Sequence, residues 1–264
     1  MESDPYNATI SQIDIFNEYT WIFHIKSDVG NLPEFEPGQF TTIGLIDEAT
    51  PPKIGKDGKP RPKWIRRAYS IASASDVRDH FELLIILVDD GKLTPKLFKL
   101  GVGGRLWLSP KISGDFTLNP VPESSNIAFI GTGTGVAPYV SMIRRYRDQG
   151  RWNKYTVIQG VRYGKDLAYR SEFEKLAEED PNFTYIACVT RDEAWTGTKG
   201  RVPVALEPAF FEEHTGWPLR AEDCHAFLCG SPQMIDDVEA LLIERGFKTH
   251  KKKDPGNIHL ERYW

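Results

Sequence analysis

Four internal segments and the C-terminus hold residue types that could bind phosphate or a redox cofactor. The first segment is Arg67-Ala68-Tyr69-Ser70. An arginine can pair with a pyrophosphate, and in a strand the tyrosine two residues later points to the same face. The serine faces the other side and offers a hydroxyl. The alternative is an ordinary strand entry without a ligand.

The second segment, Asp90-Gly91-Lys92-Leu93-Thr94-Pro95, has the composition of a turn that leads into a helix. Gly91 permits a tight turn, and Thr94 and Pro95 suit the N-cap and the first helical position. We therefore expect Thr94 to cap a short helix over residues 96–100, whose free N–H groups can hold phosphate. A capped surface helix that binds nothing is the alternative.

The third segment, Gly131-Thr132-Gly133-Thr134-Gly135-Val136-Ala137-Pro138, lies between a predicted strand and a predicted helix. Its glycines let the main chain approach a ligand closely, and the following helix offers its positive end. The run is not a strict G-x-G-x-x-G. Its place at the first strand–helix turn of the second half of the chain nevertheless predicts nucleotide binding.

The fourth segment and the C-terminus each have a functional and a structural explanation. Cys229-Gly230-Ser231-Pro232 closes the last strand of the alternating region and opens the last helix, where open α/β sheets bind ligands. A small buried residue before a turn is the alternative for this cysteine. The terminal Trp264 could pack on a flat cofactor or on the core of the protein itself.

The first half of the chain must position its motif on strands. Its apolar runs are short, alternate with polar residues and are separated by glycine and proline, as in an antiparallel barrel or sandwich. The runs cover residues 21–25, 39–45, 68–72, 81–88 and 105–108. No long 3.6-residue pattern precedes Pro120.

The second half alternates strands with helices. Short apolar strands at 126–130, 155–160, 185–189 and 225–229 are separated by helical stretches such as 169–179, which is typical of a parallel doubly wound sheet. In the last helix, Ser231 suits the N-cap, Pro232 the first turn and Gly246 the stop. We predict an antiparallel β-barrel domain over residues 1–122 and an α/β parallel-sheet domain over residues 123–264.

Composition and charge exclude several classes of protein. The chain has 264 residues with 33 basic and 37 acidic side chains, and the resulting net charge of −4 argues against general nucleic-acid binding. Cys188, Cys224 and Cys229 form no C-x-x-C pair and cannot supply the four ligands of a plant-type iron–sulfur cluster; we predict no metal site. The acidic N-terminus and the short apolar run at 83–88 predict a soluble cytoplasmic protein without a membrane segment.

The order of the motifs resembles that of the bacterial ferredoxin (flavodoxin)–NADP⁺ reductases. R-x-Y-S, G-K-L-T-P, G-T-G-T-G-x-A-P, C-G-S-P and a terminal E-x-Y-W follow one another across nearly the whole chain, most like the subgroup that ends on tryptophan. The resemblance implies a monomeric oxidoreductase with FAD on the barrel domain and NADP(H) on the α/β domain. Such an enzyme passes electrons between NADPH and ferredoxin or flavodoxin.

The resemblance also assigns residues to the two cofactors. It implies an FAD site at Arg67, Ala68, Tyr69, Ser70, Ile85, Lys92, Leu93, Thr94, Thr134 and Trp264. It implies an NADP site at Gly133, Arg162, Thr190, Arg191, Arg201, Cys229 and Gly230. Around the reacting centre it implies roles for Ser70, Cys229, Glu261 and Trp264.

Within these sets the individual roles differ. Arg67 would pair the pyrophosphate, Tyr69 would stack on the isoalloxazine, and Ser70 would approach flavin N5. Trp264 would cover the other flavin face and yield its place to nicotinamide before hydride transfer. No general acid is needed for that step, so we do not expect Glu261 to be indispensable, although its loss could disturb proton supply or nicotinamide orientation.

NADP⁺ preference has a physical argument of its own. A 2′-phosphate is bound by arginine or lysine, whereas NAD⁺ sites typically set a carboxylate against the ribose hydroxyls. Thr190-Arg191 follows one predicted strand, Lys199-Gly200-Arg201 comes shortly after, and Arg162 follows another strand. Solvated loop charge is the alternative.

One departure from the family that the chain resembles is the segment from Ile46 to Arg66, where a shorter loop is expected. Between residues 51 and 66 there is one acidic residue, Asp57. The basic residues of the same stretch are Lys53, Lys56, Lys59, Arg61, Lys63 and Arg66. Because ferredoxins and flavodoxins are acidic, we hypothesise that this loop helps to dock the electron partner. A plain solvated insertion is the alternative.

Two other functions fit the same two domains. One is a stand-alone NAD(P)H-dependent flavin reductase component that serves an oxygenase or another haem enzyme. The other is a flavin- or nucleotide-binding module without turnover. The presence of Ser70, Cys229 and Trp264 around the expected nicotinamide site argues against the second.

Overall fold

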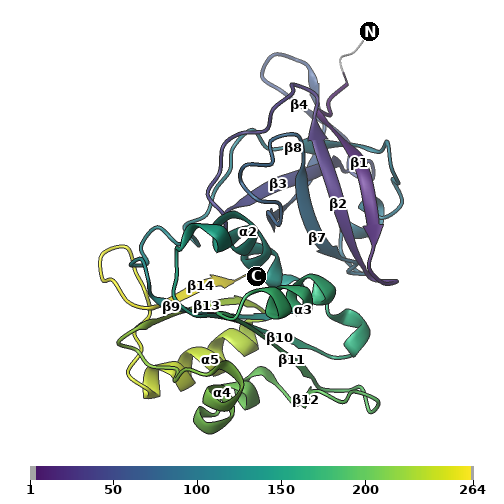
Figure 1. Cartoon of the computed structure of the whole chain (residues 1–264). Coiled ribbons are helices and arrows are strands. Elements are labelled where there is room, and N and C mark those ends of the chain that lie inside the picture. The colour runs from purple at the N-terminus through teal and green to yellow at the C-terminus, as the bar shows by residue number, and fades with distance from the viewer. Residues whose placement is uncertain (1–3, 263–264) are drawn as a thin grey trace. The chain divides into compact units, whose positions relative to one another are not determined.

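The computed structural model describes residues 4–262, which divide into two compact units (Figure 1). The first unit is Met1–Asp115 and the second is Phe116–Trp264. The division thus falls between Asp115 and Phe116, whereas the sequence analysis placed it between residues 122 and 123. Each unit has its own sheet and its own core.

The first unit is built on a six-stranded antiparallel sheet with the order β6-β3-β8-β1-β2-β7. The strands are β1 (Ala8–Ile15), β2 (Thr20–Ser27), β3 (Phe40–Ile46), β6 (Trp64–Ser70), β7 (Phe81–Ile86) and β8 (Arg105–Leu108). The sheet curves so that its two edge strands, β6 and β7, come together. Just beyond β6, the Ala72 N–H donates to the Glu82 carbonyl oxygen of β7 (2.8 Å). A small separate hairpin pairs β4 (Lys53–Ile54) with β5 (Pro60–Arg61).

Alternating apolar residues make these strands. Phe23 and Ile25 of β2 and Leu83 and Ile85 of β7 are fully or almost fully buried, on the face that encloses the core. Burying one such side chain contributes roughly 1.5–3 kcal/mol, so the period-2 pattern fixes which face turns inward. The strands predicted for the first half are confirmed.

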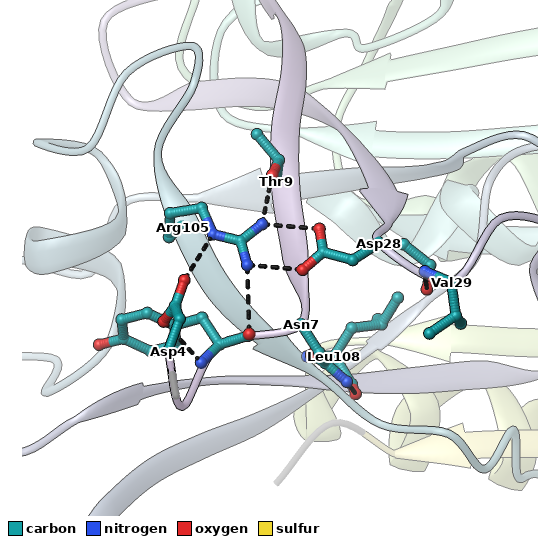
Figure 2. Close-up of polar contacts among 9 residues, drawn as sticks. Asp4, Asn7, Thr9, Asp28, Val29, Arg105 and Leu108 are labelled. Atoms are coloured by element: carbon teal, nitrogen blue, oxygen red, sulfur yellow. Dashed lines mark hydrogen bonds and ion pairs between the residues drawn. The ribbon is translucent and has the colours of Figure 1, made fainter. Parts of the chain in front are cut away.

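An arginine clasp ties the N-terminal segment to the sheet (Figure 2). The Arg105 guanidinium donates twice to Asp28 (2.6 and 2.7 Å), once to Asp4 (3.0 Å), once to the Thr9 hydroxyl (2.6 Å) and once to the Tyr6 carbonyl oxygen (3.1 Å). All five of its N–H groups are therefore used. The Asp28 carboxylate contributes most to raising the pKa of Arg105 above its ordinary value.

The second unit is a six-stranded parallel sheet with the order β12-β11-β10-β9-β13-β14, as predicted. The strands are β9 (Asn126–Thr132), β10 (Tyr155–Val161), β11 (Phe183–Val189), β12 (Thr198–Lys199), β13 (Cys224–Gly230) and β14 (Ile258–Arg262). The α-helices are α2 (Ala137–Tyr146), α3 (Arg170–Glu179), α4 (Pro208–Thr215) and α5 (Pro232–Glu244).

Helices cover both faces of this sheet, α4 and α5 one face and α2 and α3 the other (Figure 1). Every residue of β10 is accordingly buried. The strand order runs outwards from β9 in both directions, to β10 and to β13. The turns that leave β9 and β13 therefore flank the switch point, where open α/β sheets bind ligands.

The caps of two helices can be compared with the sequence predictions. Ser231 caps α5 as predicted: its hydroxyl accepts the Met234 N–H (3.3 Å), and Gly246 follows the helix with a φ of +84°. For α1 (Thr94–Leu97) the prediction was wrong, because the helix is shorter than expected and Leu93 holds the N-cap position. The Thr94 hydroxyl bonds to the main chain of Val88 instead.

The described part of the chain has neither a membrane-spanning helix nor a cluster of metal-binding side chains. No helix there is both long and apolar enough to cross a membrane. Residues 4–262 also contain no group of three or more histidine, cysteine or acidic side chains arranged to hold a metal ion.

Candidate functional site

The turns after β9 and β13 pack against each other main chain to main chain. A Cβ on Gly135 would lie 2.2 Å from the Cys229 carbonyl oxygen, and a Cβ on Gly230 would lie 2.3 Å from the Thr132 hydroxyl oxygen. That hydroxyl accepts the Ser231 N–H (2.9 Å). A side chain at either position would clash with the facing turn, so these two glycines let the turns pack together.

Gly133, in the first turn, differs from its neighbours. Its φ of +55° lies in the left-handed region, and no atom would come within 4 Å of an added Cβ. The main chain here is bare and open, at the carboxyl end of β9 and just before α2. This is the part of the motif that can approach a nucleotide, as predicted for the segment as a whole.

The sequence analysis overlooked Tyr139, which supports this turn from α2. Its ring is completely buried. Its hydroxyl group is within donating distance of two carbonyl oxygens, that of Ile130 (2.8 Å) and that of Phe227 (2.9 Å). Burial holds the pKa of Tyr139 well above its ordinary value, so the hydroxyl keeps its proton. A Cβ on Gly131 would lie only 2.9 Å from this ring.

The structure brings together Cys229 and Glu261, two of the predicted reacting-centre residues. They are direct neighbours in the pairing of β13 with β14. The buried Cys229 thiol donates to the Glu261 carboxylate, with 3.6 Å between Sγ and Oε2. Trp264 lies outside the described residues.

Cationic side chains gather at the carboxyl ends of β10, β11 and β12. The Arg191 N–H donates to the Arg162 carbonyl oxygen (2.8 Å), and the Gly200 N–H donates to the Val189 carbonyl oxygen (3.0 Å), which brings Arg201 beside the same edge. All three arginines are exposed, and their guanidinium groups form no ion pair within residues 4–262. Their positive charge is therefore not neutralised by the described chain.

Thr190 and Lys199 stand next to these arginines but are already bonded. The Thr190 hydroxyl donates to the Val161 carbonyl oxygen (3.3 Å), as does its N–H (3.2 Å), which ties the loop after β11 to β10. The Lys199 ammonium donates to the Glu193 carbonyl oxygen (3.1 Å). Both residues thus support the loops that carry the arginines.

In the first unit, β6 presents the predicted Arg67-Ala68-Tyr69-Ser70 motif. Arg67 is exposed and donates to the Arg66 carbonyl oxygen (2.7 Å), with no ion pair to any described residue. Tyr69 is half-buried against the barrel core, and burial raises its pKa above the ordinary value although the Arg67 charge opposes this. Ser70 is only 5% exposed, and Ala68 is exposed.

The other predicted flavin residues of this unit have different surroundings. A Cβ on Gly91 would lie 2.8 Å from the Val88 carbonyl oxygen, so glycine is required for this turn. Leu93 and Ile85 are each 1% exposed, and their side chains belong to the core. Lys92 is exposed, without an ion pair in the described chain, and is the side chain of this segment best placed to reach an external phosphate.

Comparison with known proteins agrees with this geometry. Residues 129–240 match the model of the oxidoreductase NAD-binding domain family. The chain is 30% identical over 248 residues to the flavodoxin/ferredoxin–NADP reductase of Buchnera aphidicola subsp. Baizongia pistaciae, covering 92% of this chain and 94% of the relative. It is 32% identical over 232 residues to the enzyme of the same name from Escherichia coli K12, covering 87% and 88%.

A solved structure has the same fold. It is a ferredoxin NADP⁺ reductase from Neisseria gonorrhoeae with bound FAD and NADP, with a TM-score of 0.83, 23% sequence identity and 98% coverage of both chains. The two-domain fold predicted from the sequence is thereby confirmed, as is the prediction of an oxidoreductase. This chain belongs to the flavodoxin/ferredoxin–NADP reductase family.

Proposed function

We propose that this protein is an FAD-dependent enzyme that passes electrons between NADPH and a ferredoxin or flavodoxin. NADPH gives up two electrons as a hydride, and the protein partner takes electrons singly. The observation that carries the proposal is the group of unpaired cations at the carboxyl edge of the parallel sheet, Arg162, Arg191 and Arg201, in a chain of this reductase family.

These arginines fit the 2′-phosphate that distinguishes NADPH from NADH. Guanidinium groups bind phosphate through paired, charge-assisted hydrogen bonds, and these three have no carboxylate in the described chain to satisfy them first. The open main chain at Gly133 lies before α2 and fits the approach of the rest of the nucleotide. We assign these residues to NADP(H).

Residues of the first unit fit FAD. Arg67 and Lys92 are exposed cations without an ion pair to any described residue, and we assign them to the phosphates. Tyr69 offers a flat, half-buried ring of the kind that stacks on a flavin. When bound, FAD supplies the hydride acceptor and the conversion between two-electron and one-electron transfer.

Ser70, Cys229 and Glu261 have positioning or proton-handling roles in this proposal. We assign Ser70 to the flavin N5 edge, where its hydroxyl can hold a proton. The Cys229 thiol and the Glu261 carboxylate already contact each other, and we assign them to the orientation of nicotinamide. Replacing Glu261 by glutamine is expected to lower turnover without abolishing it.

Trp264 is assigned by family resemblance to the flavin face that nicotinamide must occupy. A chain that ends at Tyr263 lacks this competitor, so nicotinamide should stack more readily and the preference for NADPH over NADH should relax. Steady-state kinetics with the two coenzymes measure this directly. Identical coenzyme kinetics in the shortened chain would rule out the assignment.

For the electron partner, we propose that the β4–β5 hairpin and its flanks form a docking surface. Lys53 of β4 lies opposite Arg61 of β5 in the strand register, and the Gly55 N–H donates to the Lys59 carbonyl oxygen (2.8 Å). Ile54, in the same hairpin, is 69% exposed. Asp57 neutralises Arg61 across 3.4 Å, so the remaining lysines leave the hairpin positive. Such a surface attracts an acidic partner.

Arg66 adds a fixed cation to this surface. Its guanidinium lies 4.1 Å from the centroid of the Trp107 ring and 5.4 Å from that of Trp64. Gly44, between them on β3, makes room for this stack, because a Cβ there would lie 3.0 Å from the Arg66 Cγ. A tryptophan–arginine pair held in this way is typical of residues that dominate protein interfaces.

We propose that the protein acts as a cytoplasmic monomer. All three cysteines are free and buried, which suits a reducing compartment. Light scattering at working concentration measures the mass directly. A stable dimer would contradict the monomer.

The test of the proposed function is electron transfer to a one-electron acceptor. We expect NADPH-dependent reduction of cytochrome c that requires added ferredoxin or flavodoxin, with NADH much less effective. Equal or better activity with NADH would instead favour a reductase component of an oxygenase system. No coenzyme consumption even with ferricyanide would favour a non-catalytic binding module.

A further inference from the structure

A carboxylate bridges the two loops that present the unpaired arginines. Asp192 lies directly after Arg191, in the loop that follows β11. Its Oδ2 accepts the N–H of Gly164, in the loop that follows β10 (3.1 Å), and its Oδ1 accepts the N–H of Ala194 in its own loop (3.1 Å). One side chain thus fixes the loop of Arg162 against the loop of Arg191.

Trp195 fills the space beside this bridge. A Cβ on Gly164 would lie 3.0 Å from the indole Cε3, and a Cβ on Gly197 would lie 2.9 Å from the indole Nε1. Neither glycine has a positive φ, so both are required for room and not for backbone conformation. The Arg170 guanidinium, at the start of α3, lies 4.9 Å from the indole centroid. The indole therefore packs against both loops and against α3.

The presence of Asp192 here is unexpected for a phosphate site. A carboxylate beside Arg191 repels a phosphate, and in NAD sites a carboxylate accepts hydrogen bonds from ribose hydroxyls. In this chain, however, each oxygen of the Asp192 carboxylate already accepts a main-chain N–H. The geometry gives the carboxylate a supporting task in place of a ligand contact.

We propose that Asp192 and Trp195 are positioning residues that hold the two arginine loops in the arrangement that selects the 2′-phosphate. The proposal rests on the proposed function, since it concerns NADPH preference. Bonds from Thr190 to Val161 and from Arg191 to Arg162 join the two loops where they leave the strands, and the carboxylate bridge adds an attachment further out, at Gly164. Held at both places, the guanidinium groups act on one phosphate together, which lowers the entropy cost of binding.

Binding of nucleotide fragments to the full chain tests the proposal without turnover. Isothermal titration would compare adenosine 2′,5′-bisphosphate with AMP, which lacks the 2′-phosphate, for the wild type, Asp192→Asn and Glu193→Gln. Asp192→Asn keeps the shape of the side chain but replaces one acceptor by a donor. Glu193→Gln removes the same charge one residue away, where the side chain is exposed.

Positioning and simple repulsion predict opposite signs for Asp192→Asn. If the bridge positions the arginines, affinity for the bisphosphate falls about tenfold, the loss typical of one hydrogen bond to a charged group, while affinity for AMP changes less than twofold. If the carboxylate only repels phosphate, affinity for the bisphosphate rises. A rise, or no change, would overturn the role of Asp192. Glu193→Gln should bind both ligands as the wild type does.

Trp195 is tested by a second pair of variants. Trp195→Phe keeps a flat ring between the glycines and should retain most of the selectivity for the bisphosphate over AMP, whereas Trp195→Ala should lose it. Equal selectivity in Trp195→Ala and the wild type would exclude a role for the indole. A wild type that binds both ligands equally would instead contradict the proposed NADPH preference itself, whatever the variants do.

Discussion

Replacing Arg191 by alanine is expected to weaken NADPH selectively. The Arg191 guanidinium is exposed and makes no ion pair within the described chain, so its removal leaves no buried partner unsatisfied and the fold should be unchanged. A hydrogen bond to a charged group contributes roughly 1.5–3 kcal/mol, equivalent to about ten- to hundredfold in affinity. Because Arg162 and Arg201 remain beside the same edge, we expect the lower part of this range.

The assay is steady-state diaphorase activity with NADPH and with NADH. The 2′-phosphate is remote from the reacting carbon, so its contact acts equally on the ground and transition states. We expect the KM for NADPH to rise about tenfold with kcat nearly unchanged, and kcat/KM for NADH to stay within about twofold of the wild type. The difference should shrink in high salt.

Arg220→Ala is the control, because it removes the same charge before the amino end of β13, at the opposite end of the strands from the arginine loops. Arg220 pairs with Asp223 at the surface (2.8 Å), and losing such a pair costs at most about 1 kcal/mol of stability. Arg220→Ala should leave both coenzymes unaffected. The reasoning would be refuted if Arg191→Ala impaired NADH as strongly as NADPH, or if Arg220→Ala reproduced its effect.

Three further predictions follow from particular contacts. Tyr139→Phe removes a buried hydroxyl from two carbonyl oxygens and should lower the free energy of unfolding by about 1–2 kcal/mol in urea titrations. Changing Lys53, Lys56 and Lys59 to glutamine should raise the KM for the protein partner and flatten its salt dependence, without affecting NADPH–ferricyanide activity. Burial lowers the pKa of His259 to about 3, so stability should fall as pH drops from about 7 towards 4, and less so in His259→Gln.

The sign of the pH prediction follows from where the proton binds. His259 is 4% exposed, and burial, followed by the neighbouring His225 and His250, disfavours its charged form in the folded state. The unfolded chain takes up a proton near the ordinary histidine pKa of about 6.5. Between these two values only the unfolded state is protonated, so acid favours unfolding. Constant stability from pH 7 to 4 would contradict this account.

Much of the fold was predictable because its signals are local. Alternating side chains such as Phe23 and Ile25 define barrel strands, and the Ser231 cap with Gly246 beyond the helix defines α5. The Thr94 cap was mispredicted because its hydroxyl bonds to the main chain of Val88, six residues earlier, in the turn that follows β7. Local cap preferences cannot include such a competing partner.

The candidate site was predictable only in part. The arginines and the glycine-rich turns stand out as residue types, but their use depends on contacts between distant loops. The close packing of Gly135 on Cys229, 94 residues later in the chain, is one such contact. Asp192 looks unfavourable in a phosphate site until its bond to Gly164, 28 residues away, is known. An R-D-x-x-W run followed two residues later by glycine is the signal that could have been noticed.

The most direct test of the central claim is an anaerobic titration of the purified protein followed by its visible spectrum. We predict a flavin spectrum that NADPH bleaches readily and NADH poorly, which would establish cofactor, activity and coenzyme preference in one experiment. A colourless protein that takes up no added FAD would contradict the account. Bleaching by NADH at least as readily as by NADPH would contradict the assignment of the arginine cluster to the 2′-phosphate.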